Sequence, residues 1–232
     1  MKKKLVVLSG PSCVGKGPLI EAVKNYHPEI KFAQPILLHT RKPRWKRDSK
    51  SYEIHGVDYY FFPRGFMEQL DRSRFAVTNI RSEMQAVDLV QLQGLFKKHD
   101  LVLTEAYPTL ARLVIKWAKK QTKYKLEIRS VFLSPLSGEE IQEKAKTLNK
   151  SPEDVVTDIM REKLKRRGED SPKVIEERAA SAWWEMQHAS EYMDHIVNPA
   201  GEDDLQQWGD PLGAEAKRIL GEFVAILRIE EE

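Results

Sequence analysis

The sequence predicts an α/β fold in which helices cover a mostly parallel sheet in three layers. Short apolar runs at residues 5–8, 101–104, 128–133 and 195–198 are typical of buried parallel strands. Helical patterns separate these runs, and strands that alternate with helices indicate an α/β sheet. A glycine-bounded loop follows the first run directly, at the carboxyl end of a strand, where such sheets bind their ligands.

The helices are expected wherever apolar side chains recur at helical spacing. Their expected ranges are 18–25, 65–71, 87–98, 110–122, 138–145, 152–166, 172–193 and 214–227. Ser151 is the expected N-cap of the helix at 152–166, because Pro152 suits the first helical position and acidic residues fill the first turn.

Residues 9–18 read Ser-Gly-Pro-Ser-Cys-Val-Gly-Lys-Gly-Pro and are the most informative segment. Two glycines let the backbone wrap so that successive N–H groups point at an anion, and the lysine can reach the terminal phosphates of a nucleoside triphosphate. The positive end of the following helix points to the same place. The sequence therefore predicts a P-loop NTPase core that binds ATP through Gly10, Ser12, Cys13, Val14, Gly15, Lys16 and Gly17.

The loop departs from the usual pattern directly after its lysine. A serine or threonine hydroxyl commonly stands there and ligates Mg²⁺, but Gly17 and Pro18 follow Lys16 here. Mg²⁺ is therefore expected to rely on phosphate oxygens, water and a carboxylate from elsewhere in the chain. Cys13 is expected to fill a tight turn; the alternative is a redox-sensitive thiol, because a helix N-terminus lowers thiol pKa values.

Length and composition limit the function classes. The 232 residues are 41% hydrophobic and 31% charged, which fits one globular domain with inserted parts. The 38 basic residues are interleaved with 35 acidic ones, so no dedicated nucleic-acid surface is expected. No apolar stretch is long enough for a membrane helix. A single cysteine fits a reducing cytosol, so we expect a cytoplasmic protein; a homodimer is one open oligomeric state.

A second set of motifs follows the loop. Residues 39–44 read His-Thr-Arg-Lys-Pro-Arg, a pair of arginines suited to one phosphate, and residues 56–61 read Gly-Val-Asp-Tyr-Tyr-Phe. Together with the loop they resemble the guanylate kinase family, whose members carry Gly-Pro-Ser-x-x-Gly-Lys, T-T-R-x-P-R and G-x-D-Y-x-F. Three later stretches resemble the family's lid, the helix after it and its V-I-V-N strand: 167–171, 178–185 and 195–198.

The resemblance implies ATP-dependent phosphoryl transfer, with Mg²⁺, to a nucleoside monophosphate, by family default GMP or dGMP. It also implies a single P-loop kinase domain over residues 1–232, with an acceptor-binding insertion and a helical lid. The implied parts are a core at 1–35, 98–135 and 173–232, a monophosphate-binding insertion at 36–97 and a lid at 136–172.

Residue roles carry over from the family's motifs. Arg41, Arg44 and Tyr59 match residues that hold the acceptor's phosphate, and Arg167 and Arg178 match arginines that neutralise the transferring phosphoryl group with Lys16. Such roles agree with the chemistry, because phosphoryl transfer is mostly positioning and cationic stabilisation of charged oxygens. Three further basic residues of the lid, Lys163, Lys165 and Arg166, are expected to be mostly a solvated helix face.

The positions that read guanine in the family differ here. Leu37, Val77 and Thr104 stand where the family has a serine, a glutamate and an aspartate. Glu105 is the nearest remaining carboxylate and a candidate for base or Mg²⁺ contacts, although strand alternation turns it away from Thr104. Thr104 and Glu105 complete the expected acceptor-binding set. The acceptor stays open: a nucleoside monophosphate, a modified nucleotide or a ribose phosphate, with a nucleotide-binding pseudo-kinase as the alternative.

Overall fold

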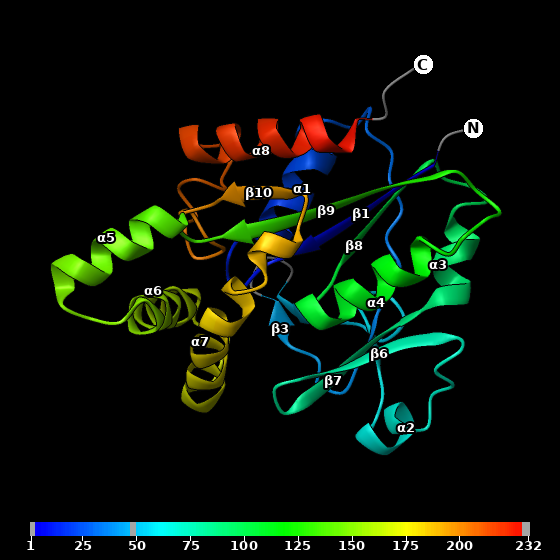
Figure 1. Cartoon of the computed structure of the whole chain (residues 1–232), viewed down its shortest axis with the longest axis horizontal. Coiled ribbons are helices and arrows are strands. Elements are labelled where there is room, and N and C mark those ends of the chain that lie inside the picture. The colour runs from blue at the N-terminus through cyan, green and yellow to red at the C-terminus, as the bar shows by residue number, and fades with distance from the viewer. Residues whose placement is uncertain (1–2, 47–49, 229–232) are drawn as a thin grey trace. The chain divides into compact units, whose positions relative to one another are not determined.

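The computed structural model describes residues 3–46 and 50–228 (Figure 1). Its strands are β1 (Lys3–Ser9), β2 (Leu38–His39), β3 (Trp45–Lys46), β4 (Ser51–Tyr52), β5 (Tyr60–Phe61), β6 (Phe75–Ile80), β7 (Glu83–Asp88), β8 (Leu101–Glu105), β9 (Leu126–Ser134) and β10 (Asp194–Val197). Its α-helices are α1 (Lys16–Tyr26), α2 (Arg64–Glu68), α3 (Leu89–Leu95), α4 (Pro108–Ala118), α5 (Gly138–Leu148), α6 (Pro152–Arg167), α7 (Pro172–Met186) and α8 (Ala214–Leu227). A 3₁₀ turn at Ala189–Glu191 follows α7.

The expected α/β fold with a mostly parallel central sheet is confirmed. The central sheet has the strand order β10-β9-β1-β8, and β10 runs parallel to β9 with Ile196 opposite Leu133. All seven residues of β1 are buried, which explains why residues 5–8 at its centre are an unbroken apolar run rather than an alternating one. All four strands of this sheet lie where the sequence predicts them, within two residues at either end.

The chain divides into two compact units. Unit 1 comprises Met1–Val7 and Lys31–Arg129, and unit 2 comprises Leu8–Ile30 and Ser130–Glu232. Unit 2 contains α6 packed against α5 and α7, and α8 packed against α1 and β10. Unit 1 contains a second sheet of order β5-β2-β7-β6, with α2, α3 and α4 packed on β6 or β7.

The second sheet was not expected from the sequence. In this sheet β2 runs parallel to β5, and β7 runs antiparallel to both β2 and β6. The helix predicted at 87–98 begins only at Leu89, because Asp88 ends β7 and caps α3 by accepting the N–H groups of Val90 and Gln91. The helix predicted at 65–71 is the shorter α2.

Further helix boundaries differ from their predicted positions: α4 covers Pro108–Ala118 instead of 110–122, and α5 ends at Leu148 instead of residue 145. Helix α1 begins at Lys16, two residues before Pro18, with Gly15 as its N-cap in the left-handed region. Helix α7 ends at Met186 instead of residue 193. By contrast, α6 begins as predicted, since the Ser151 hydroxyl accepts the N–H of Asp154.

Candidate functional site

The loop after β1 is shaped by its two glycines. Gly10 has φ +143°, and a Cβ there would lie 2.3 Å from the carbonyl oxygen of Leu133. Gly15 has φ +95°, and a Cβ there would lie 2.3 Å from Nδ2 of Asn198. Any larger residue at either position would therefore collide with a neighbour in addition to straining the backbone. Both glycines are therefore needed for this loop conformation.

Asn198 holds the loop from the end of β10. Its side chain is fully buried, and Nδ2 donates to the carbonyl oxygen of Val14 at 2.7 Å. Sequence reasoning noted the strand but gave this residue no role. Asn198 could have been singled out because it is a polar residue directly after an apolar strand, where a buried amide needs a defined hydrogen-bond partner.

Lys16 stands at the first position of α1, where the loop passes into the helix. Its Nζ donates to the carbonyl oxygens of Gly10 and Pro11, both at 2.8 Å, so the ammonium group lies over the loop rather than in the solvent. Val14 is buried, whereas Ser12 and Gly17 are partly exposed beside it. The arrangement gives an anion backbone N–H groups, a helix N-terminus and one flexible cation.

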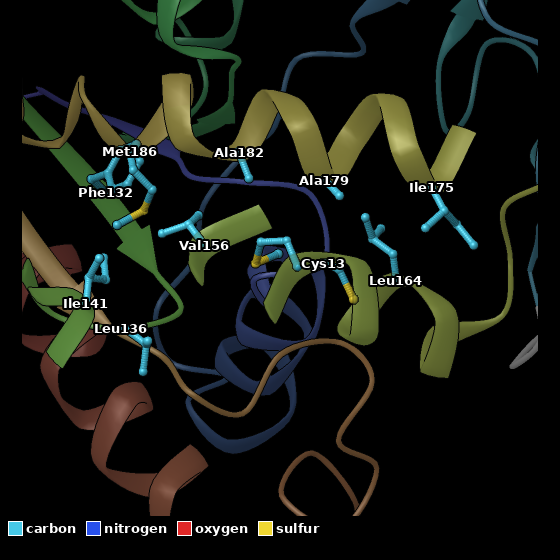
Figure 2. Packing of buried hydrophobic residues seen from close by; sticks show 11 residues of the cluster. Cys13, Phe132, Leu136, Ile141, Val156, Leu164, Ile175, Ala179, Ala182 and Met186 are labelled. Carbon is cyan, nitrogen blue, oxygen red and sulfur yellow. The ribbon is translucent and has the colours of Figure 1, made fainter. Parts of the chain in front are cut away.

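Cys13 is a packing residue of this loop. It is 1% exposed and packs in an apolar cluster with residues of α6 and α7. Figure 2 shows this cluster, including Leu164 of α6 and Ala179 of α7. Burial, and then the charge of Glu202, raise the pKa of the Cys13 thiol to about 12. The thiolate is the reactive form, so burial and the raised pKa of Cys13 favour the tight-turn interpretation over a redox-sensitive thiol.

Arg167 and Arg178 come together in unit 2. Both side chains are buried, and Asp170 accepts hydrogen bonds from both guanidinium groups, that of Arg178 at 3.1 Å. Arg167 also donates to Glu202 at 2.6 Å and lies 3.2 Å from Glu169. Burial alone would lower the pKa of Arg167, but Glu202 and the neighbouring acids raise it above its usual value. Both arginines stay charged and are fixed in position by carboxylates.

The end of α6 is anchored to the segment after β10. Lys163 is buried, donates to the carbonyl oxygen of Pro199 and lies 3.6 Å from Asp203, which also pairs with Arg166 at 2.8 Å. Lys165 and Arg166 are exposed, so the expectation that most of these three residues form a solvated face is confirmed, and Lys163 is the exception. A buried ammonium group needs such partners, and a one-sided helical pattern does not reveal them. These contacts set the position of the last turn of α6, which carries Arg167.

Arg41 is the centre of a second cluster, in unit 1. Its guanidinium binds the carboxylate of Glu53 through both terminal nitrogens, with 2.7 Å between NH2 and Oε1. Glu53 also accepts the backbone N–H of Arg44 at 2.8 Å. Burial would lower the pKa of Arg41 and raise that of Glu53, but the ion pair reverses both shifts. Sequence reasoning missed Glu53, which fixes the geometry of the Arg41 and Arg44 pair.

The ion pair between Arg41 and Glu53 makes the stability of the fold depend on pH. The pKa of Glu53 in the folded chain lies below the ordinary value of 4.5, so the pair stabilises the fold above that pH. The contribution is lost as the pH falls through the lowered pKa. The carboxylate therefore stays charged, and stays paired with Arg41, throughout the neutral range.

Tyr59 lies beside Arg41, with its ring centroid 4.7 Å from the guanidinium carbon. Burial, and then the negative charge of Glu105, raise the pKa of Tyr59 above its usual value. Glu105, at the end of β8, is therefore close enough to act on this cluster electrostatically. Thr104 is fully buried, and its hydroxyl donates to the carbonyl oxygen of Glu105 at 3.4 Å. Arg41, Arg44 and Tyr59 thus belong to one group in unit 1, and the charge of Glu105 acts on Tyr59.

Two apolar residues, Leu37 and Val77, stand at positions where the resemblance predicts contacts to guanine. Leu37 is 7% exposed and precedes β2. Val77, on β6, packs against the cluster of Leu38, Met67 and Met84. Neither side chain offers an acceptor for the N–H groups of guanine, and an unpaired buried donor costs about 1–3 kcal/mol.

The described side chains provide no ready-made metal centre. Within residues 3–46 and 50–228, no three Asp, Glu, His or Cys side chains gather as metal ligands. Packing does not forbid a hydroxyl after Lys16, because a Cβ at Gly17 would meet no atom within 4 Å. No helix in the same residues is long and apolar enough to cross a membrane.

The comparisons with known proteins agree with this geometry. A family model described as guanylate kinase matches residues 2–162, a range that includes the loop and the Arg41 cluster but ends before Arg167 and Arg178. The guanylate kinase of Trichormus variabilis is 30% identical over 210 residues, covering 88% of this chain and 86% of that protein. The guanylate kinase of Corynebacterium jeikeium is 28% identical over 195 residues, covering 84% and 87%.

A solved structure shows the same fold. The crystal structure of guanylate kinase from Anaplasma phagocytophilum superposes with a TM-score of 0.58 at 19% sequence identity. The match covers 97% of this chain and 85% of that one.

Proposed function

The chain belongs to the guanylate kinase family of nucleotide kinases, and on that premise we propose that it transfers the γ-phosphoryl group of ATP to the phosphate of a nucleoside monophosphate. The observation that carries the proposal is Lys16, whose ammonium group lies over a glycine loop shaped for phosphate. The proposed products are ADP and a nucleoside diphosphate. An acceptor phosphate is already an anion at neutral pH, so no side-chain base is needed.

Unit 2 supplies the donor side of the proposed reaction. The loop N–H groups and Lys16 bind the phosphates of ATP, and Arg167 and Arg178 neutralise the charge that builds up on the equatorial oxygens. Asp170, Glu169 and Glu202 hold these arginines before the reaction, so little reorganisation is needed when charge develops. In this proposal α5 and α6 form the lid, and residues 136–172 are its extent.

Unit 1 supplies the acceptor side. Arg41, Arg44 and Tyr59 bind the monophosphate, with Arg41 and Arg44 aligned by Glu53. Mg²⁺, when bound, neutralises the phosphate oxygens of ATP; it would be held mainly by those oxygens and water, with Glu105 as the candidate carboxylate of the chain. GMP or dGMP is the family's acceptor. Leu37 and Val77 favour a second candidate, another phosphorylated acceptor such as a modified nucleotide or a ribose phosphate.

Replacing Arg41 tests the acceptor assignment. Arg41→Ala is expected to raise the KM of the best acceptor about 10- to 100-fold, because charged hydrogen bonds to one phosphate are lost. The KM of ATP should change little. The measurement is steady-state ADP release with each substrate varied in turn.

Two controls separate binding from folding in this experiment. The double variant Arg41→Ala/Glu53→Gln removes the carboxylate charge that the single variant leaves without its guanidinium partner. Arg64 is an exposed arginine of the same unit and pairs with Glu68, so Arg64→Ala serves as the control for loss of an arginine outside the cluster. A single variant that is weakened only toward ATP would refute the assignment.

A further inference from the structure

The hairpin formed by β3 and β4 exposes two aromatic rings in unit 1. Trp45 and Tyr52 are directly opposite each other in its antiparallel register, and their ring centroids are 5.1 Å apart at 75°. Trp45 is 48% exposed and Tyr52 is 62% exposed. A cross-strand aromatic pair stabilises a short hairpin, but burial of the rings is the usual outcome. A pair this open leaves ring surface available to a ligand.

The same segment is strongly basic. Residues 41–53, both ends included, contain six basic and two acidic residues, although the whole chain has a net charge of only +3. The carboxylate of Glu53 is already used by Arg41, and that of Asp58 pairs with Lys46 at 3.1 Å. Lys42 and Lys50, by contrast, are exposed on either side of the aromatic pair.

We propose that this hairpin binds single-stranded nucleic acid, with bases stacked on Trp45 and Tyr52 and phosphates near Lys42 and Lys50. Unpaired bases stack on aromatic side chains without regard to sequence, and cations along the path bind the backbone. Duplex bases are already stacked on each other, so a duplex is a poorer ligand. A second copy of the chain fits less well, because two such hairpins would bring like charges together.

This binding is separate from phosphoryl transfer and does not depend on it. It also departs from the expectation of no nucleic-acid surface, which rested on the charge of the whole chain. Charge averaged over 232 residues hides a local excess when basic and acidic residues balance elsewhere. Two aromatic residues interleaved with lysines and arginines form a pattern that favours single-stranded nucleic acid over a small anion as the ligand.

The experiment measures binding of a short fluorescein-labelled oligo-dT strand by fluorescence anisotropy, with the full chain at low and moderate salt. Saturable binding that weakens as salt rises is expected. The double variant Trp45→Ala/Tyr52→Ala removes both rings and should bind at least about 5- to 150-fold more weakly, which is the loss expected for a single stacked base. Lys42→Gln should reduce the salt dependence instead. Thermal unfolding confirms that each variant is folded.

Matched controls decide the result. Trp184, on α7 in unit 2, is 42% exposed, so Trp184→Ala removes a comparable ring from another surface and should leave the affinity unchanged. Saturating ATP should not displace the strand, because the hairpin is distinct from the phosphate loop. The proposal is overturned by any of three results: no binding at low salt, equal losses in the hairpin and Trp184 variants, or displacement by ATP. If the double variant instead loses a dimer in light scattering but binds oligo-dT as the parent does, the hairpin binds a second copy of the chain.

Discussion

Lys16→Ala is expected to lower ATP-dependent turnover by about 100- to 1,000-fold or more while leaving the chain folded. The loss of one preorganised group that stabilises developing charge has this size in enzymes. Within residues 3–46 and 50–228, Lys16 Nζ donates to two loop carbonyl oxygens and pairs with no carboxylate, so its removal leaves no buried carboxylate unpaired. The measurement is ADP release at saturating acceptor, with thermal unfolding as the test of folding.

Lys24→Ala is the matched control for this variant. Lys24 lies on the same helix, is exposed and pairs with Glu21 at 2.7 Å, an exposed contact of small energetic value. The turnover of Lys24→Ala should equal that of the parent. If Lys16→Ala keeps turnover within a few-fold of the parent, the loop does not bind the donor as proposed.

Arg167→Ala is expected to lower kcat about 100- to 1,000-fold with a much smaller change in the KM of either substrate. The reason is that Arg167 is assigned to charge that develops only as the phosphoryl group moves. Removing it also leaves Glu202 and Asp170 short of a partner in a buried place, so the melting temperature should fall as well. Steady-state kinetics and thermal unfolding are measured on the same sample.

A second pair of variants separates the two effects. Arg167→Lys keeps the charge and much of the stability but cannot reproduce the paired hydrogen bonds, so its kcat should stay low. Arg161→Ala removes a partly exposed arginine of the same helix that binds Glu176 and should leave kcat intact. A loss in kcat confined to samples that are partly unfolded would mean that Arg167 is structural only.

Much of the central sheet was predictable because its strands are buried. A strand buried on both faces needs a continuous apolar run, and the runs at 5–8 and 128–133 lie within β1 and β9. The second sheet was missed because β2 and β5 have two residues each, too few for any pattern to show. Strands β6 and β7 pair with each other, and the residue pattern of one strand alone does not reveal the register of that pairing.

The cationic residues of the site were easier to predict than the residues that hold them. Lys16, Arg41 and Arg167 stand in local motifs, whereas their partners come from elsewhere in the sequence. Glu53 is twelve residues from Arg41, and Glu202 is thirty-five from Arg167. Buried cations require such carboxylates, but sequence does not say which ones, because only the fold brings them together. The roles of the cationic residues themselves stay predictions.

The most direct test of the proposed activity is a coupled ADP-release assay with ATP, Mg²⁺ and separate acceptors: GMP, dGMP, AMP, CMP, UMP, dTMP and ribose phosphates. We expect ADP release that depends on a nucleoside monophosphate and is lost in Lys16→Ala. Turnover with ribose phosphates alone would keep the phosphoryl transfer and replace its acceptor. ATP binding without ADP release for any acceptor would contradict the proposed kinase activity.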